Sequence, residues 1–442
     1  MPDSKPPVAF IGLGAMGFGM ATQLVKQGYQ VTGSDVWPPT LKRFKEAGGE
    51  CASSPAEAAR GKSYCVCMVA TAQQTQEALL DGPDPAIPAL EKGAVVLLCS
   101  TVPCGYVQDL EKQLTDRGRS DILLVDCPVS GGALRAANGT LSIMAGATDP
   151  EAITKGKDLL RAMSDPEKLY IVEGGIGAGS NMKMCHQVLA SVQILAASEI
   201  MGFAAHLGLD LPSTGKALVE SDGWSWMLEN RLPRILHPEF QPLLSAVTII
   251  LKDTMIITSE ARRYGFPTPM VSTAEQAYFV GLGRGFGADD DASLIRIYTE
   301  GRGKVGPVAG QAESDEKKLK LVTSLLKGIH LCAASECLAF AHRVGLDLDQ
   351  TLELCVNAAG GSAMLGKFGP DLVNILRGNR PSVLGLVDLA QEVREAVDEA
   401  HRLKVPLFLG NQALSIMRLA LQHKPKELPD MPQAMAVKVW AA

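Results

Sequence analysis

The segment Gly12–Gly17 has the spacing of a loop that binds a phosphate group. It reads GLGAMG, and it lies between a β-branched run and a helical stretch. Glycines at this spacing permit a tight turn and let the backbone approach a pyrophosphate at a helix N-terminus. Asp35 ends the next β-branched run, where a carboxylate can accept hydrogen bonds from ribose hydroxyls. Together these features predict a site for a nicotinamide dinucleotide.

Asp35 also bears on which dinucleotide would bind. A carboxylate at this place would repel a 2′-phosphate, so it favours NAD over NADP. Lys42 and Arg43 lie nearby and keep NADP open. An ordinary glycine turn followed by a turn aspartate is the plainer interpretation, but the strand before the loop and the helix after it favour a cofactor.

Ser130, Gly131 and Gly132 form a second candidate site directly after another β-branched run. A hydroxyl and unhindered backbone N–H groups in such a turn can make a nest that binds an anion, here a substrate carboxylate. A Ser-Gly-Gly sequence by itself is more often a plain loop, so its role depends on the motifs around it.

Lys183 lies in the first turn of a long predicted helix, which Ser180 is expected to cap and which runs to about His206. His186 and Gln187 follow three and four residues later, so all three side chains share one face. A lysine at a helix start usually points to water. The neighbouring glycines and the polar cluster on an otherwise apolar helix favour a functional role for this lysine instead.

Alternating patterns place these residues in two kinds of domain. Residues 1–173 alternate β-branched runs with amphipathic helices, which predicts a Rossmann-type doubly wound parallel sheet with ligands at the carboxyl ends of its strands. Residues 174–302 read as an all-α domain, 303–316 as a linker, and 317–442 as a second all-α domain ending in a tail over the surface. The predicted fold class is therefore α/β, with the all-α domain duplicated.

The duplication rests on an internal repeat. Leu195–Leu211 matches Cys332–Leu348 with ten identities in seventeen positions and no gap, and Asp222–Leu228 matches Ala359–Leu365 at the same offset. The apolar pattern of the first copy recurs in the second. We therefore expect the two copies to pack on each other through an approximate two-fold axis.

Composition excludes several other classes of protein. The net charge of the 442 residues is −6, and no basic run offers a footprint for nucleic acid. The ten cysteines form no CxxC pair, which argues against a metal site and suits a reducing compartment. The N-terminus lacks the apolar stretch of a signal peptide, and no segment is expected to span a bilayer. We expect a cytoplasmic protein without a membrane or nucleic-acid partner.

Five motifs in order resemble the 3-hydroxyisobutyrate dehydrogenase family of β-hydroxyacid dehydrogenases, which share their cofactor domain with 6-phosphogluconate dehydrogenases. They are GLGAMG, Ser100-Thr101, the segment Asp126–Gly132 (DCPVSGG), the segment Gly177–Lys183 (GAGSNMK) and Lys252-Asp253. The match runs from about Val8 to Tyr298. The second all-α copy resembles the duplicated domain of the 6-phosphogluconate dehydrogenases.

The resemblance implies an NAD(P)-dependent hydroxyacid dehydrogenase in which Lys183 is the acid/base residue. The implied cofactor-binding residues are Gly12, Leu13, Gly14, Ala15, Met16, Gly17, Asp35, Met68, Val69, Thr101 and Lys252. The implied substrate-binding residues are Ser130, Gly131, Gly132, His186, Gln187, Ser225 and Trp226. The ligand would be a small hydroxy acid, and the protein a monomer or a homodimer.

The chain departs from the family at a substrate position and at a cofactor position. Most of the family has two Asn where this chain has His186 and Gln187, and the usual Leu-Pro is Val69-Ala70 here. The Lys-x-x-His-Gln form, with SWMLENR and ADDDASLIRIY, is similar to the L-threonate dehydrogenase branch. This favours a four-carbon sugar acid, with a 3-hydroxyisobutyrate-type substrate, an imine reductase or reductive aminase, and a non-catalytic cofactor-binding protein as alternatives.

The second all-α copy keeps one candidate residue but not the site. Lys320 stands at the position of Lys183, whereas His186 becomes Thr323 and no glycine turn precedes it. We therefore interpret the second copy as structural.

Overall fold

The computed structural model describes residues 5–300, 314–379, 384–424 and 430–440. The chain forms two compact units, of which the first ends at Lys183 and the second begins at Met184. Most of the predicted linker, residues 303–313, lies outside the described residues. Its last residues belong to the next helix, because Ser314 caps α14 (Asp315–Arg343) by accepting a hydrogen bond from the N–H of Lys317.

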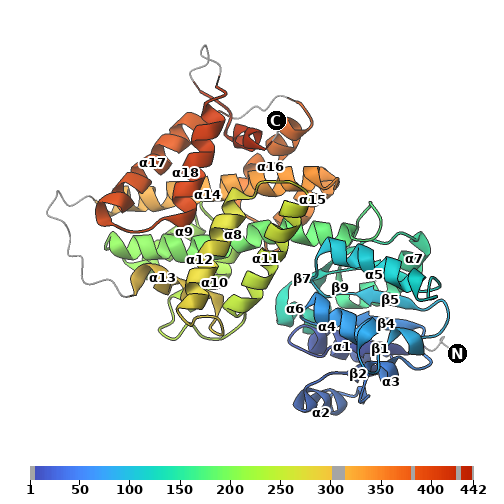
Figure 1. The fold of residues 1–442 in the computed structure, drawn as a ribbon. Coiled ribbons are helices and arrows are strands. Elements are labelled where there is room, and N and C mark those ends of the chain that lie inside the picture. Colours follow the sequence, from blue (N-terminus) through green and yellow to red (C-terminus); the bar gives the residue numbers. More distant parts are fainter. Residues whose placement is uncertain (1–4, 301–313, 380–383, 425–429, 441–442) are drawn as a thin grey trace. The chain divides into compact units, whose positions relative to one another are not determined.

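The first unit contains a six-stranded parallel sheet with the strand order β3-β2-β1-β4-β5-β6 (Figure 1). This is the order of a doubly wound dinucleotide-binding sheet, so the predicted fold class is confirmed. The strands are β1 (Val8–Ile11), β2 (Val31–Ser34), β3 (Glu50–Cys51), β4 (Tyr64–Cys67), β5 (Val95–Leu98) and β6 (Leu123–Asp126).

Helices cover both faces of this sheet because its strands are apolar on both sides. On β1, Val8 and Phe10 belong to one core cluster, and Ala9 and Ile11 belong to the other. The first cluster contains side chains of α1 and α7, the second those of α3 and α5. The helices of this unit are α1 (Gly17–Lys26), α2 (Pro38–Glu46), α3 (Pro55–Ala59), α4 (Ala72–Gln76), α5 (Cys104–Asp116), α6 (Gly132–Asn138) and α7 (Pro150–Met163), with the short helices η1 (Glu77–Asp81) and η2 (Ile87–Ala89).

The last strands of the unit form a separate sheet, which the sequence pattern did not predict. Strand β8 (Leu141–Ala145) pairs antiparallel with β7 (Val129–Ser130) and parallel with β9 (Ser164–Ile171). A β-branched run looks the same whichever strand it pairs with. The assignment of these runs to one parallel sheet was therefore wrong.

The second unit is helical and is built from two sets of elements in the same order (Figure 1). The first set is α8 (Ala178–His206), which begins in the first unit, α9 (Leu211–Val219), α10 (Trp226–Ile235), α11 (Val247–Arg263), α12 (Pro269–Gly283), η3 (Asp291–Ile295) and α13 (Arg296–Thr299). The second set is α14, α15 (Leu348–Asn357), α16 (Ala363–Leu376), α17 (Leu386–Leu403), α18 (Phe408–Leu421) and η4 (Gln433–Val439). Equivalent residues cap equivalent helices: Asp210 and Asp347 cap α9 and α15, and Ser225 and Ser362 cap α10 and α16.

Buried carboxylates join the two sets reciprocally. Glu199 on α8 accepts hydrogen bonds from the N–H groups of Leu409 and Gly410 at the start of α18. Glu336 on α14 stands at the equivalent position of the repeat and accepts from Met270 and Val271 at the start of α12. Each carboxyl group thus supplies acceptors that the first turn of a helix in the other copy lacks.

The backbone repeats this reciprocity between α10 and α16. Ser225 and Ser362, which are equivalent, form an antiparallel bridge. The N–H of Trp226 donates to the carbonyl of Gly361, and the N–H of Ala363 donates to the carbonyl of Trp224. Equivalent residues that pair with each other define an approximate two-fold axis, so the packing predicted from the repeat is confirmed.

Two helices contradict the expectation that no segment could span a bilayer. Among the described residues, α8 and α14 are long and apolar enough to do so by length and composition, with 29 residues each. However, 94% and 89% of their most apolar stretches are buried inside the protein. A core helix of a large helical unit needs the same apolar length, which explains their composition.

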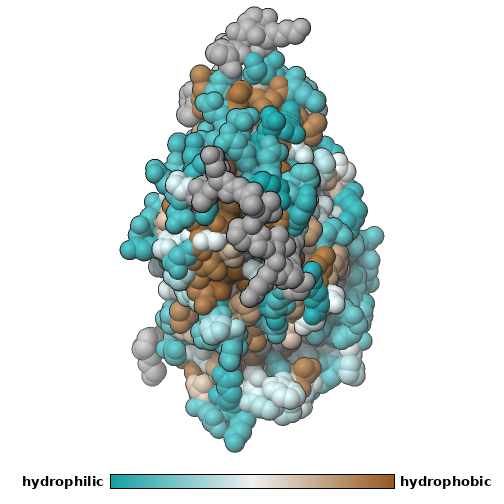
Figure 2. Space-filling view, turned by 90° about the vertical axis from the view of Figure 1, so that its left-hand side faces the viewer, coloured by the Kyte–Doolittle hydropathy of each residue, from teal (hydrophilic) through white to brown (hydrophobic). Residues whose placement is uncertain are grey.

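The described part of the C-terminal tail is more deeply packed than a surface segment. Met431, Ala434, Ala436 and Val437 are buried, and the indole N–H of Trp440 donates to the carbonyl of Pro267. Apolar residues also reach the surface, and Figure 2 shows patches of them among polar ones on one face.

We predict that Glu336 makes stability depend on pH. Burial raises the pKa of Glu336 to about 8 from an ordinary 4.5, against the two backbone N–H groups, which lower it. The folded state therefore favours the protonated acid. Its contribution is complete below about pH 4.5 and is lost as the pH rises through about 8, with a slope of at most ~1.4 kcal/mol per pH unit.

Glu336→Gln removes this ionisation, so its free energy of unfolding should fall less than that of the parent protein between about pH 5 and 9. Chemical denaturation at a series of pH values measures both. Glu353→Gln, at an exposed acid on α15, is the control and should follow the parent. Identical slopes for Glu336→Gln and the parent would contradict the prediction.

Candidate active site

The glycine loop of the first unit is shaped by close backbone packing. Gly12 has a φ of 93°, and a Cβ there would lie 2.3 Å from the carbonyl oxygen of Met68. A Cβ at Gly17 would lie 2.0 Å from the carbonyl oxygen of Gly12. By contrast, Gly14 is exposed, and a Cβ there would meet nothing within 4 Å. Two glycines are therefore required by packing, and the backbone between them faces open space at the start of α1.

Asp35, immediately after β2, is tied to this loop. Its Oδ2 accepts from the N–H of Leu13 at 2.6 Å, and its Oδ1 accepts from the N–H of Trp37 at 2.8 Å. Its side chain is only partly buried. The exposed loop, the helix start and this carboxylate have the groups that a dinucleotide requires, namely backbone N–H donors for a pyrophosphate and an acceptor for ribose hydroxyls. The contacts of these residues with a cofactor stay a prediction.

The other predicted cofactor residues of this unit follow neighbouring strands of the sheet. Met68 and Val69 follow β4, and Thr101 lies just beyond β5. The N–H of Val69 donates to Oγ of Ser100 at 2.8 Å, which joins the ends of the two strands. Because β1, β4 and β5 are adjacent and parallel, these residues and Gly12 lie together at the carboxyl ends of the strands. Sheets of this type bind their ligands there.

The predicted carboxylate nest lies between β7 and α6. Ser130 is the last residue of β7 and pairs with Ser142 of β8. Gly131 and Gly132 have φ values of 138° and 75°, a region that L side chains rarely adopt. This explains why glycine stands at both positions, and it leaves their binding of a substrate as a prediction.

Asp126 holds the start of the helix that carries Lys183, a role that the sequence analysis missed. Helix α8 begins at Ala178, so the prediction of Ser180 as its cap was wrong. Instead, the N–H and the hydroxyl of Ser180 both donate to the carboxylate of Asp126, at 2.6 and 2.7 Å. Burial raises the pKa of Asp126 to about 7, against the hydrogen bonds from Ser180 and Gly177. The sequence shows an acid at the end of an apolar run, but nothing in it identifies Ser180 as the partner of that acid.

Lys183 and its counterpart in the repeat have different surroundings. Lys183 lies in the second turn of α8 and not, as predicted, in the first, because the helix begins at Ala178; only 6% of Lys183 is exposed. The side chain of Lys320 is 66% exposed and forms an ion pair with Glu392 at 3.3 Å. The structure thus distinguishes two lysines that the repeat makes equivalent.

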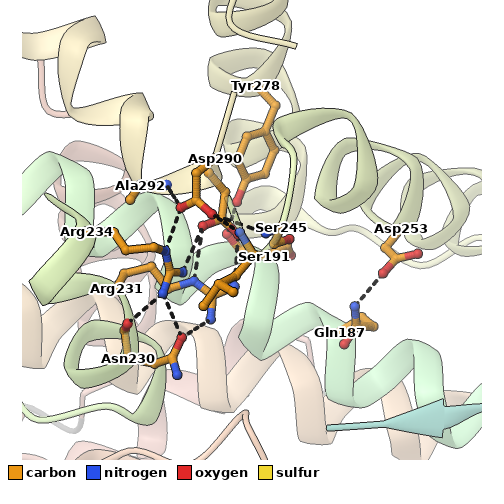
Figure 3. A network of polar contacts seen from close by, with 12 residues as sticks. Gln187, Ser191, Asn230, Arg231, Arg234, Ser245, Asp253, Tyr278, Asp290 and Ala292 are labelled. Atoms are coloured by element: carbon orange, nitrogen blue, oxygen red, sulfur yellow. Dashed lines mark hydrogen bonds and ion pairs between the residues drawn. The ribbon is translucent and has the colours of Figure 1, made fainter. Parts of the chain in front are cut away.

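In the helical unit, His186 and Gln187 belong to a chain of hydrogen bonds. Nε2 of Gln187 donates to Oδ2 of Asp253 at 2.6 Å (Figure 3), and Oε1 of Gln187 lies 3.1 Å from Nδ1 of His186. Asp253 also pairs with Lys252, its Oδ1 lying 3.0 Å from Nζ. At the other end, the N–H of Gly360, from the second copy, donates to Nε2 of His186 at 3.1 Å.

A second network fixes the loop that precedes α11 (Figure 3). Arg231 and Arg234 on α10 pair with Asp291 and Asp290 at 2.9 and 2.8 Å, and all four side chains are buried. Burial raises the pKa of Asp290, but the guanidinium of Arg234 and the N–H groups of Leu244, Ala292 and Ser245 outweigh it, so the pKa lies below its ordinary value. Thus SWMLENR and ADDDASLIRIY, far apart in the sequence, meet in one structural cluster.

Ser225 and Trp226 have roles at the start of α10. Ser225 is fully buried, and its hydroxyl accepts from the N–H of Leu228 as the helix cap. Trp226 is half-buried. The contact of these two residues with a substrate stays a prediction.

Comparison with known proteins supplies the family. Residues 7–175 match the family described as the NAD binding domain of 6-phosphogluconate dehydrogenase. Residues 177–298 and again 316–437 match the family described as NAD-binding of NADP-dependent 3-hydroxyisobutyrate dehydrogenase. This chain belongs to the 3-hydroxyisobutyrate dehydrogenase family. It is an NAD(P)-dependent hydroxyacid dehydrogenase, as the motifs implied.

Individual relatives agree with this. An L-threonate dehydrogenase of Cupriavidus necator is 39% identical over 66% of this chain and 95% of its own length. The structure of a 3-hydroxyisobutyrate dehydrogenase from Salmonella typhimurium is 32% identical, with a TM-score of 0.61 over 66% of this chain and 100% of that one. The 6-phosphogluconate dehydrogenase of Plasmodium falciparum shares the fold at 16% identity, with a TM-score of 0.69 over 96% of this chain and 94% of its own.

We predict that Asp35 sets the preference between NAD and NADP. Asp35→Asn removes the charge but keeps one oxygen to accept from a backbone N–H, so the loop should survive. The ratio of kcat/KM with NADP to that with NAD should rise about tenfold, because a 2′-phosphate no longer meets a carboxylate. Asp84→Asn, at an exposed acid outside the loop, is the control. An unchanged ratio in Asp35→Asn would refute the assignment.

Proposed function

We propose that this dehydrogenase oxidises a four-carbon sugar acid, such as L-threonate. The single observation that carries the proposal is the similarity to an L-threonate dehydrogenase, at 39% identity over 95% of that protein's length. The Lys-x-x-His-Gln sequence at Lys183, His186 and Gln187, which departs from the two Asn of most of the family, supports it.

In this reaction the protein's own residues bind the substrate carboxylate, transfer the hydroxyl proton and contact the cofactor. Bound NAD(P) supplies the hydride acceptor. The hydroxyl and backbone N–H groups of Ser130, Gly131 and Gly132 bind the substrate carboxylate. Lys183 takes the proton from the reacting hydroxyl during oxidation and returns it during reduction. Lys252 contacts the cofactor in this proposal, as the resemblance implies.

The proposal divides the chain by task. Residues 1–173 bind the cofactor, 174–302 carry Lys183 and its helix, and 317–442 brace that helix domain. The reciprocal carboxylates Glu199 and Glu336 support the bracing role, since each caps a helix of the other copy.

A 3-hydroxyisobutyrate-type substrate is the second candidate. The Salmonella typhimurium relative that carries this name is 32% identical and matches over its whole length. The two candidates differ in the number of hydroxyls, so a direct comparison of substrates separates them.

Lys183→Met should abolish turnover and leave cofactor binding nearly intact. Loss of an acid/base group lowers kcat by about 10²–10⁴-fold or more, because no residue then moves the hydroxyl proton. Titration of NAD binding by fluorescence checks that the cofactor site persists. Lys320→Met is the matched control and should retain parental kcat. Damage confined to Lys320→Met would show that the site has been assigned to the wrong copy.

A substrate panel tests the specificity. L-threonate and its stereoisomers, 3-hydroxyisobutyrate and 3-hydroxypropionate would each be assayed with NAD and with NADP. We expect kcat/KM for a four-carbon sugar acid to exceed that for 3-hydroxyisobutyrate by at least about tenfold, because a site built for extra hydroxyls loses hydrogen bonds with analogues that lack them. Equal or better efficiency with 3-hydroxyisobutyrate would refute the substrate and favour the second candidate.

A further inference from the structure

The backbone N–H of Gly360 determines which atoms donate and which accept in the hydrogen bonds around His186. A backbone N–H can only donate, so Nε2 of His186, 3.1 Å from the nitrogen of Gly360, must accept and carries no proton. The proton of the neutral ring therefore stands on Nδ1, which donates to Oε1 of Gln187. The amide of Gln187 is thereby oriented with its NH₂ toward Asp253, as its 2.6 Å bond to Oδ2 requires.

The opposite tautomer of His186 would disrupt each hydrogen bond from Gly360 through His186 and Gln187 to Asp253. A proton on Nε2 would face the N–H of Gly360, and the bare Nδ1 would require the NH₂ of Gln187. The amide oxygen would then face the carboxylate of Asp253. His186 is fully buried and Gln187 is 9% exposed, so the lost bonds would be costly to replace.

We propose that His186 is a positioning residue, held by Gly360 of the second copy, that acts through Gln187 and Asp253 on the amine of Lys252. This inference rests on the proposed function for the role of Lys252 toward the cofactor. It gives His186 a task in place of the direct substrate contact expected from the sequence. It also gives the second copy a part in the chemistry beyond bracing.

Comparison of the two copies explains why the hydrogen bond runs from a glycine of the second copy to a histidine of the first, and why the reverse pair does not form it. Gly360 stands at the position of Gly223, and each of these glycines packs against an equivalent leucine of the other copy, Leu189 and Leu326. His186, however, is matched by Thr323, which has no ring nitrogen to accept from Gly223. The backbone of the two copies is therefore reciprocal, and the side chain that uses it is present in the first copy alone.

Nitrogen NMR on protein with ¹⁵N-labelled histidine tests the tautomer directly. The spectrum should contain the signal of a neutral histidine protonated on Nδ1 that disappears in His186→Leu but persists in His342→Leu, which removes an exposed histidine of α14. A His186 signal from the Nε2–H tautomer, or from the doubly protonated ring, would overturn the proposal. This readout needs no substrate.

Cofactor titration tests the coupling to Lys252. We expect His186→Leu to weaken NAD binding about tenfold, and His186→Asn, which keeps an N–H donor for Gln187, to weaken it much less. Added to Lys252→Met, His186→Leu should have almost no further effect, because it acts through that lysine. Full additivity of the two substitutions would overturn the proposal.

The proposed function would be refuted by a different result from the one that refutes the role of His186. An absence of turnover with every hydroxy acid would refute the function, while the tautomer and the coupling in cofactor binding would still be decided by the measurements above.

Discussion

The helical unit depends on two buried glutamate side chains, each of which caps a helix of the other copy. The first turn of a helix leaves backbone N–H groups without acceptors, and an apolar interior offers none. Glu199 supplies them to α18 and Glu336 supplies them to α12, each from the middle of a long core helix. Because the donors and acceptors come from different copies, neither copy can satisfy these groups alone. The packing of the two copies is therefore stabilised by hydrogen bonds between them as well as by apolar burial.

This reciprocity has a consequence for the residues near Lys252. With the two copies locked about an approximate two-fold axis, α10 and α16 pair through Ser225 and Ser362. Two residues before Ser362, the N–H of Gly360 reaches His186. The same geometry that braces the fold thus places a backbone donor where it can fix a ring tautomer. A covalent second copy supplies that donor within one chain.

Helix α8 forms part of the core and carries the proposed acid/base residue, and these two roles account for its composition. Most of its length is apolar because it is buried. Its start is tied to Asp126 by two hydrogen bonds from Ser180, one turn before Lys183. A lysine with acid/base chemistry must be held in a defined place, and a helix anchored to the end of a sheet strand is a rigid support for it. Further along, the polar residues His186, Gln187 and Glu199 each have a buried partner.

The sequence by itself determined the features that depend on local pattern. The glycine spacing at Gly12–Gly17, the alternation of strands and helices, the repeat and the position of Lys183 all follow from neighbouring residues, and they sufficed for the fold class and the family. The repeat even implied the two-fold packing, since matched apolar faces have one obvious way to bury each other.

Only the tertiary structure decided which distant groups meet. The separate sheet of β7, β8 and β9, the partner of Ser180, and the contact between His186 and Gly360, 174 residues apart, depend on pairings that leave no local signal. Asp126 ends a strand, as its apolar run indicates, but its contact with Ser180 could not be read from the residues beside it, nor could the contact of Gly360 with His186. A polar side chain in a buried place takes its role from whichever donor or acceptor the fold brings within about 3 Å, and that choice is made by the packing of the whole unit.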